Sequence, residues 1–199
     1  MTQKELRDRL AQIPIEEAAP MLLGARLIGP DAEAAIVEVE SYGGEDDAGS
    51  HAWRGPTPRT RIMYGQPGFA FVYFTYGNHW MLNMVGREEG RAGAILIRGA
   101  MPVSGIENMR QRRLKARTDE DLLSGPGKIA AAFGLSGEHN GLDLLDSESP
   151  LQVIPGDAPG EYWTGVRVGL SPQRGAETPW RFIDLRRARW ASRPRPAPL

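Results

Sequence analysis

The 199-residue chain contains no cysteine, and this absence excludes several kinds of chemistry. Without thiols the protein can form no disulfide, no thiolate metal centre and no cysteine nucleophile. The sequence also lacks an apolar run near the roughly 20 residues that a membrane-spanning helix needs, and its start does not resemble a signal peptide. We therefore expect a soluble, cytoplasmic protein without a membrane partner.

Histidine is scarce and the charges nearly balance, with three histidines and a net charge of −1. The acids of residues 45–47 and the nearby His51 match no established metal loop, so we expect neither metal nor other cofactor. A serine hydrolase is disfavoured because no Gly-x-Ser-x-Gly elbow occurs. Nucleic-acid binding, if present, must come from an uneven distribution of charge.

The first half of residues 35–51 alternates with the period of a half-buried strand. The alternation predicts one apolar face with Val37, Val39 and Ser41. The opposite face carries two carboxylates, in the set Ile36, Glu38, Glu40 and Tyr42. A carboxylate beside an aromatic ring suits a pocket that activates water against a flat ligand. The alternative is a strand with a solvated outer face.

Other segments predict the remaining elements of a single domain over residues 1–192, followed by a disordered Arg- and Pro-rich tail over 193–199. Short helices are expected over 2–12 and 15–23. Strands are expected at 69–76, 80–85, 94–100, 166–170 and 180–185, the first two joined at the hairpin signal Gly77-Asn78.

Two segments are candidates for contact with phosphates. Ser104 and Glu107 have the spacing of a capping box, which predicts a helix that starts there. It would carry a basic stripe: Arg110, Arg112, Arg113, Lys115 and Arg117. A solvated helix face explains the same pattern equally well.

The second segment is Ser124-Gly-Pro-Gly-Lys128, which should open a helix that runs to Phe133 and is closed by Gly134. It is not a nucleoside-triphosphate loop, because Ile129 stands where a Ser or Thr would hold magnesium. The amides of Ser124 and Gly125, with Lys128 nearby, could instead bind one phosphate of a DNA backbone. The alternative is a capped helix with a surface lysine.

Several motifs together resemble the alkyladenine (3-methyladenine) DNA glycosylase family. They follow the order of that family and cover most of the chain from about Leu22 to Trp190: Glu38 to His51, Thr57-Pro-Arg-Thr-Arg61, Val72 to Gly77, Asn83, Leu96-Ile-Arg98, Ser124 to Lys128 and Arg167-Val-Gly169. The resemblance implies hydrolytic excision of damaged purines from DNA.

The resemblance also implies roles for single residues. Glu40 matches the general base, Arg98 the arginine that holds the attacking water, and the carbonyl of Val168 a further contact to that water. The residues that match the base pocket are Tyr42, His51 and Tyr73, which contact the flipped base, and Asn83, which crowds the 2-amino group of guanine. Tyr76 matches the side chain that wedges into the vacated base stack.

Two positions depart from the family pattern and bear on substrate range. His79 stands near the wedge where relatives carry tyrosine, and Gly49 stands beside the base where they carry alanine. We expect His79 to contact DNA and Gly49 to contact the base. No lysine matches a pocket position, so no Schiff-base lyase step is expected.

The hairpin register decides whether the implied pocket can form. A two-residue Gly77-Asn78 turn would put Tyr73 and Asn83 on opposite faces of the sheet. A three-residue loop over 77–79 would pair Tyr73 directly with Asn83. Because the pocket needs both side chains, we predict the three-residue loop, with Tyr76 exposed at its shoulder.

We therefore predict an α+β protein, a single domain with a curved, mostly antiparallel sheet flanked by helices. The predicted activity is that of a monofunctional DNA glycosylase, a monomer acting on double-stranded DNA that contains a damaged purine. The substrate class is 3-methyladenine, 7-methylguanine, hypoxanthine and ethenoadenine. A catalytically silent nucleic-acid module of the same fold and a hydrolase of free nucleosides are the alternatives.

Overall fold

The computed structural model describes residues 1–156 and 160–197. Its strands form one eight-stranded sheet in the order β3-β4-β5-β2-β1-β6, with β8 paired to β2 and to β7. All of these pairings are antiparallel. The strands are β1 Arg26–Ile28, β2 Glu33–Tyr42, β3 Ala70–Thr75, β4 His79–Val85, β5 Ala94–Ser104, β6 Gln152–Ile154, β7 Tyr162–Gly165 and β8 Arg181–Asp184. The predicted α+β class is confirmed.

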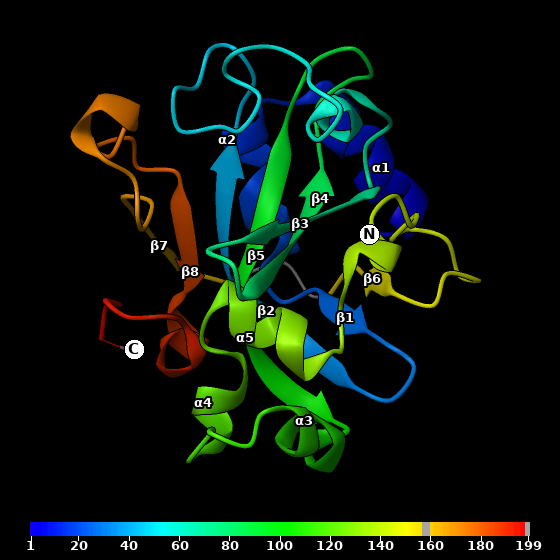
Figure 1. Ribbon diagram of the computed structural model, residues 1–199, viewed down its shortest axis with the longest axis vertical. Coiled ribbons are helices and arrows are strands. Elements are labelled where there is room, and N and C mark those ends of the chain that lie inside the picture. Colours follow the sequence, from blue (N-terminus) through cyan, green and yellow to red (C-terminus); the bar gives the residue numbers. More distant parts are fainter. Residues whose placement is uncertain (157–159, 198–199) are drawn as a thin grey trace.

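Short helices cover the sheet. The α-helices are α1 Gln3–Gln12, α2 Ile15–Ala18, α3 Ile106–Arg112, α4 Asp119–Leu123 and α5 Pro126–Ala132. Figure 1 shows α1 and α2 in the upper half, behind the sheet, and α3 and α4 at the lower end, with α5 just above them. Short 3-10 helices lie at Ala19–Leu22, Arg61–Tyr64, Gly137–His139, Pro172–Arg174 and Leu185–Trp190. None of the helices in the described ranges is long and apolar enough to cross a membrane.

The predicted capping box at Ser104 is wrong. Strand β5 continues to Ser104, and α3 starts at Ile106 after Gly105, whose φ is +71°. A Cβ at Gly105 would lie 2.1 Å from the carbonyl oxygen of Asp31, so the close approach of that backbone requires glycine here. Because α3 ends at Arg112, the cations at 113–117 lie in the connection that follows it.

Two further expectations on secondary structure need correction. Residues 166–170 form no strand, and the strand of that region is β7, which ends at Gly165. The N-terminal helix expected over 15–23 is a single α-turn continued by a 3-10 helix that contains Pro20. Proline has no amide hydrogen to extend the α-helical pattern. By contrast, α5 with Gly134 after it confirms the helix predicted from Ser124 to Phe133.

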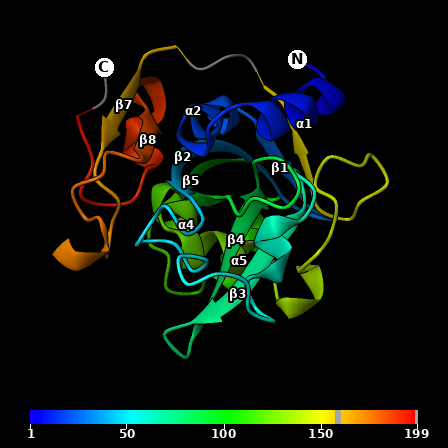
Figure 2. The same cartoon turned by 90° about the horizontal axis from the view of Figure 1, so that it is seen from above.

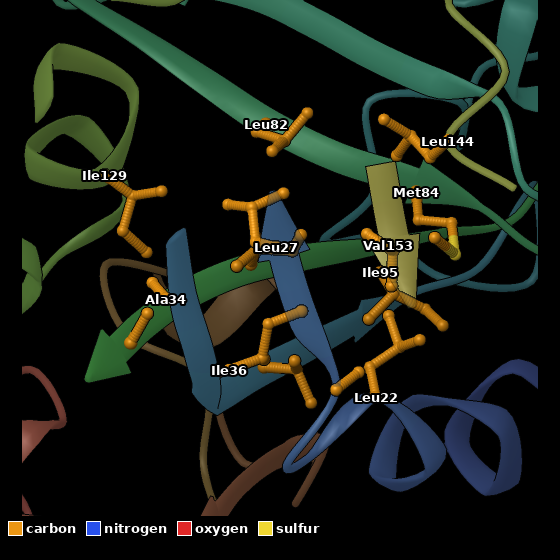
Figure 3. Close-up of a cluster of buried hydrophobic side chains, with 14 of the residues drawn as sticks. Leu22, Leu27, Ala34, Ile36, Leu82, Met84, Ile95, Ile129, Leu144 and Val153 are labelled. Atoms are coloured by element: carbon orange, nitrogen blue, oxygen red, sulfur yellow. The ribbon is translucent and has the colours of Figure 1, made fainter. Parts of the chain in front are cut away.

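The main hydrophobic core fixes the central strands. Figure 3 shows Leu27, Ile36, Leu82 and Ile95 converging from β1, β2, β4 and β5, with Ile129 of α5 beside them. Each fully buried aliphatic side chain of this kind contributes roughly 1.5–3 kcal/mol of transfer free energy. This packing holds β2 and β5, the strands that carry Glu40 and Arg98.

Strand β2 is buried on both faces, which overturns the prediction of a half-buried strand. All residues from Ala34 to Ser41 are buried. The ladder with β5 skips Val37, since Ile36 pairs with Ala100 and Glu38 with Gly99. This β-bulge shifts the alternation by one residue, so that Ile36 and Val39 both enter the main core although the period-two pattern put them on opposite faces.

The β3–β4 hairpin has a three-residue connection at 76–78 in place of the predicted 77–79. Asn83 therefore pairs with Phe71, and the predicted direct pairing of Tyr73 with Asn83 is wrong. Tyr73 is two residues from Phe71, so it still shares a face with Asn83, as the pocket requires. Figure 2 shows the hairpin tip projecting from the body of the molecule, and Tyr76 at this tip is 81% exposed with a φ of +54°.

The end of the chain is partly attached to the sheet. Arg181 donates a hydrogen bond to the carbonyl oxygen of Pro194, and Arg195 donates one to that of Ala191. Residues 198–199 of the predicted disordered tail lie outside the described residues. The division into a domain over 1–192 and a tail stays a prediction.

Candidate active site

A cavity of about 500 Å³ opens where the hairpin, β5 and the loops after β2 and β7 meet. The residues predicted for the site that line it are Tyr42, Gly49, His51, Tyr73, Tyr76, Asn83, Arg98 and Val168. They come from segments that are far apart in sequence, and antiparallel pairing brings them together. The sequence did not single out several other lining residues, among them Phe71, Pro126 and Arg174.

Glu40 lies directly beneath this lining and is 0% exposed. Its Oε1 accepts a hydrogen bond of 2.8 Å from the amide of Val168 and lies 3.4 Å from Nε of Arg98. Its Oε2 accepts a hydrogen bond of 2.8 Å from the hydroxyl of Tyr42. The three residues that bind this carboxylate, Tyr42, Arg98 and Val168, all line the cavity.

Burial raises the pKa of Glu40, because an apolar environment disfavours the charged form. The positive charge of Arg98 and the hydrogen bonds from Val168 and Tyr42 oppose this effect on the pKa. Burial, and then the negative charge of Glu40, hold the pKa of Tyr42 well above its usual value, so its phenol stays protonated and donates. A buried carboxylate with a raised pKa is a better proton acceptor near neutral pH than an ordinary surface acid.

Val168 contacts Glu40 through its backbone amide. The role that the resemblance implies for its carbonyl stays a prediction. The preceding Arg167 is buried and forms a bidentate ion pair with Asp47, at 2.6 and 2.8 Å. Its guanidinium also lies 4.8 Å from the ring centroid of Tyr42. This buried pair joins the loop of Val168 to the loop after β2, and sequence reasoning missed it.

Gly49 makes room for that ion pair. A Cβ at this position would lie 2.7 Å from Nη2 of Arg167 and 2.8 Å from Cδ1 of Leu170. Both distances are shorter than a van der Waals contact, so alanine would displace the guanidinium or the Leu170 side chain. The departure from alanine therefore has a packing reason at the wall of the cavity.

Aromatic rings form one wall of the cavity. The ring of Tyr73 lies edge-on to His51 at 4.7 Å and is tilted against Phe71 at 5.0 Å. Burial raises the pKa of Tyr73 to about 12. Partial burial, and then the charges of Arg59 and Arg174, lower the pKa of His51, so its imidazole is neutral at pH 7.

Asn83 is held in one orientation on the same face. Its Nδ2 donates a hydrogen bond of 3.0 Å to the carbonyl oxygen of Phe71 on the neighbouring strand. This bond fixes the orientation of the side-chain amide, and Asn83 lines the cavity. The side chain is 3% exposed, so this orientation is locked by packing.

The residues predicted to bind DNA lie outside the cavity, apart from Tyr76. His79 packs against α5, since a Cβ at Gly127 would lie 2.9 Å from its ring. Arg110 forms an ion pair with Asp119, and Arg113 donates to the carbonyl oxygen of Asp121. Lys115 is exposed in the connection after α3. The basic stripe is therefore partly neutralised within the protein.

The Ser124-to-Lys128 turn joins α4 to α5. Gly125 is the N-cap of α5, and the side chain of Lys128 binds Ser124 at 3.1 Å and Asp121 at 2.5 Å. Of this turn only Pro126 reaches the cavity wall. The turn thus places its lysine beside an acid, next to the site.

The family model described as methylpurine-DNA glycosylase (MPG) matches residues 9–187. This match assigns the antiparallel α+β domain, with its buried carboxylate and ring-lined cavity, to the DNA N-glycosylases of base excision repair. The chain belongs to this family, and its substrate is DNA. The alternative of a catalytically silent module is thereby set aside.

Individual relatives are similar in sequence to this chain over most of their length. Proteins from Chlorobaculum parvum and Rhodopseudomonas palustris (strain CGA009) are each 43% identical over 184 residues, which cover 89% and 92% of this chain and 86% and 85% of theirs. A protein from Streptomyces avermitilis is 42% identical over 176 residues, covering 85% of this chain and 82% of its own. Each carries the name "Putative 3-methyladenine DNA glycosylase".

Proposed function

We propose that the protein, as a monomer, flips a damaged purine nucleotide out of double-stranded DNA into the cavity and hydrolyses the bond between base and sugar. The proposed substrates are 3-methyladenine, 7-methylguanine, hypoxanthine and ethenoadenine. The observation that carries the proposal is the carboxylate of Glu40 beside Arg98, beneath a cavity of about 500 Å³ that is lined by aromatic rings. A cavity of this volume is of the size that accepts a small flat ligand.

Glu40 acts as the general base in this proposal. It takes a proton from a water that Arg98 and the carbonyl of Val168 hold, and the water attacks the anomeric carbon. The sugar becomes oxocarbenium-like as the base departs, and the negative carboxylate stabilises that positive charge. Both carboxylate oxygens of Glu40 already accept a hydrogen bond, Oε1 from the Val168 amide and Oε2 from the Tyr42 hydroxyl. The water therefore uses the remaining acceptor capacity of one of these oxygens, or displaces the hydroxyl.

The cavity walls select the base. Tyr42, His51 and Tyr73 stack on and contact the flipped purine, and Gly49 borders it. A purine alkylated at N3 or N7 is cationic and leaves without protonation, whereas hypoxanthine and ethenoadenine need hydrogen bonds from the site. The fixed amide of Asn83 crowds the 2-amino group of guanine and so disfavours the undamaged base.

The exposed hairpin tip inserts into the DNA. Tyr76 fills the gap that the flipped nucleotide leaves, at an unstacking cost of a few kcal/mol, and His79 supports the hairpin against α5. Backbone phosphates contact the basic segment after α3 and the turn from Ser124 to Lys128. The exposure of Tyr76 and its place beside the cavity support the wedge role.

Release of free bases from duplexes that each carry one of the four lesions, in paired and mispaired contexts, tests this proposal. We expect release of 3-methyladenine at least, and none from undamaged DNA. Tyr76→Ala should slow release most for well-paired lesions, because mispaired ones are already easier to unstack. A protein that released no methylated purine, or that released guanine at a similar rate, would contradict the proposal.

Replacing Tyr42 with phenylalanine should move the acidic limb of the pH–rate profile to higher pH. The hydroxyl of Tyr42 stabilises the ionised carboxylate, so its loss raises the pKa of Glu40. The base works only when ionised, so more alkaline conditions are then needed to reach the plateau. Single-turnover base release measured from acid to neutral pH checks this. Tyr64→Phe, whose hydroxyl binds Glu45 outside the cavity, is the control and should leave the limb in place. An acidic limb that moved to lower pH would contradict the assignment of Glu40 as the base that the Tyr42 hydroxyl stabilises.

The basic stripe over residues 110–117 should contain both cations that bind phosphate and cations that are paired within the protein. Lys115→Ala is expected to reduce the slope of log Kd against log salt by about one unit, for damaged and undamaged duplexes alike. Arg110→Ala should change the slope less, because Asp119 already neutralises that guanidinium at 2.6 Å. Fluorescence titrations over a range of salt concentrations measure both. Equal slopes for Lys115→Ala and the parent protein would show that Lys115 does not contact a phosphate.

A further inference from the structure

A second buried carboxylate, Glu38, lies behind the proposed catalytic pair. It is 0% exposed and does not line the cavity. Its Oε2 accepts a hydrogen bond of 2.6 Å from the amide of Ser192, and its Oε1 accepts one of 2.8 Å from the Ser192 hydroxyl. Nε of Arg181 donates a third bond to Oε1, at 2.7 Å. Glu38 is therefore sealed off from substrate and is unsuited to be the base itself.

These same groups hold the arginine of the site. Nε of Arg98 lies 3.1 Å from Oε1 of Glu38, 3.2 Å from the Ser192 hydroxyl and 3.4 Å from Glu40. Arg98 also lines the cavity. The hydrogen bond that holds its guanidinium is donated by Nε to the Ser192 hydroxyl. A guanidinium held by Nε in this way keeps a fixed direction.

The backbone is shaped for this arrangement. The β2–β5 ladder skips Val37 and then Arg98, because Glu38 pairs with Gly99 and Val39 with Ile97. The second bulge frees Arg98 from the regular alternation of β5 and re-aims its side chain. A Cβ at Gly99 would lie 2.8 Å from Oε2 of Glu38 and 3.1 Å from Cα of Ala191, so glycine lets the C-terminal segment close over Glu38.

The charges of the cluster balance. Glu38 and Glu40 face Arg98 and Arg181, two negative groups against two positive ones, all of them buried or nearly so. Arg181 further donates to the carbonyl oxygens of Ser192 and Pro194, at 3.0 and 2.8 Å. Such a network is rigid when every member is paired, and it loosens when one partner is removed.

We propose that Glu38 and Ser192 are positioning residues that fix the guanidinium of Arg98 beside Glu40, so that the C-terminal segment 191–195 belongs to the framework of the active site. The proposal rests on the proposed roles of Arg98 and Glu40. It gives a function to a segment in which the sequence shows no motif.

A double-mutant cycle between Ser192→Ala and Arg98→Ala tests the proposal. The probe is methylated duplex DNA, and the readouts are the single-turnover release of 3-methyladenine and the Kd for the duplex. We expect Ser192→Ala to lower the rate by roughly 10- to 100-fold, the effect of a small misplacement of a catalytic group, with an unchanged Kd. In the Arg98→Ala background the same change should have almost no effect on the rate, since nothing remains to be positioned.

A residue that only stabilised the fold would lower the rate by the same factor in both backgrounds, and that result, or an unchanged rate for Ser192→Ala, would overturn the proposal. Should Ser192→Ala fail to fold, Glu38→Gln in the same cycle gives the same test. Arg189→Ala, at an exposed position just before this segment, is the control and should keep the parent rate. Glu40→Gln, measured in parallel, separates failure of the base assignment from failure of the positioning proposal.

Discussion

Replacing Glu40 with glutamine is expected to leave binding to damaged duplexes intact and to reduce base release by roughly 10²–10⁴-fold. The amide has the shape of the carboxylate but accepts no proton. It can also keep the local hydrogen bonds, because its oxygen can accept from the Val168 amide and its nitrogen can donate to the Tyr42 oxygen. The loss should therefore lie in the chemical step and not in folding.

Single-turnover release and equilibrium binding, measured on the same methylated duplex, separate the two effects. Glu89→Gln removes an exposed carboxylate and is the matched control, which should retain the parent rate. If Glu40→Gln kept a quarter of the parent rate, Glu40 would not be the base. The neighbouring acid on this strand, Glu38, could not then simply replace it, because Ser192 and Arg181 bind its carboxylate.

Replacing Asp47 with asparagine is expected to cost about 3–5 kcal/mol in the free energy of unfolding. The substitution leaves the guanidinium of Arg167 buried without a counter-charge. It also weakens the hydrogen bonds from the amides of Gly43 and Gly49 to the carboxylate, each 2.9 Å long. Because Arg167 precedes Val168, the loop that binds Glu40 should loosen as well, and base release should fall with stability.

The neighbouring acid provides the control for this prediction. Asp46 pairs with Arg87, but its side chain is 55% exposed. Water already screens such a pair, so Asp46→Asn should cost at most about 1 kcal/mol. Urea unfolding of the parent protein and of the two variants, Asp47→Asn and Asp46→Asn, gives their free energies of unfolding for comparison. Equal losses for the two substitutions would mean that burial of the Asp47–Arg167 pair contributes little.

Local sequence patterns were sufficient for much of the fold. The turn chemistry at Gly77-Asn78 gave the hairpin, and the Gly-Pro pair before Lys128 with Gly134 after the helix gave α5. These patterns work because backbone preferences of Gly, Pro and Asn act over a few residues. The motifs along the chain also singled out residues, from Tyr42 to Val168, most of which the fold brings to one cavity.

Tertiary packing alone decided the finer geometry. Period-two alternation put Ile36 and Val39 on opposite faces, but a bulge at Val37 sends both into the core, because burying both outweighs one lost ladder pair. The hairpin connection began at Tyr76 and not at Gly77, which shifted Tyr73 by two residues along β4 while keeping its face.

The ion pair of Asp47 with Arg167 and the bond from Ser192 to Glu38 join residues 120 and 154 positions apart. No local pattern encodes such pairs. Each exists because a buried charge must find its partner, and only the folded chain brings that partner within reach.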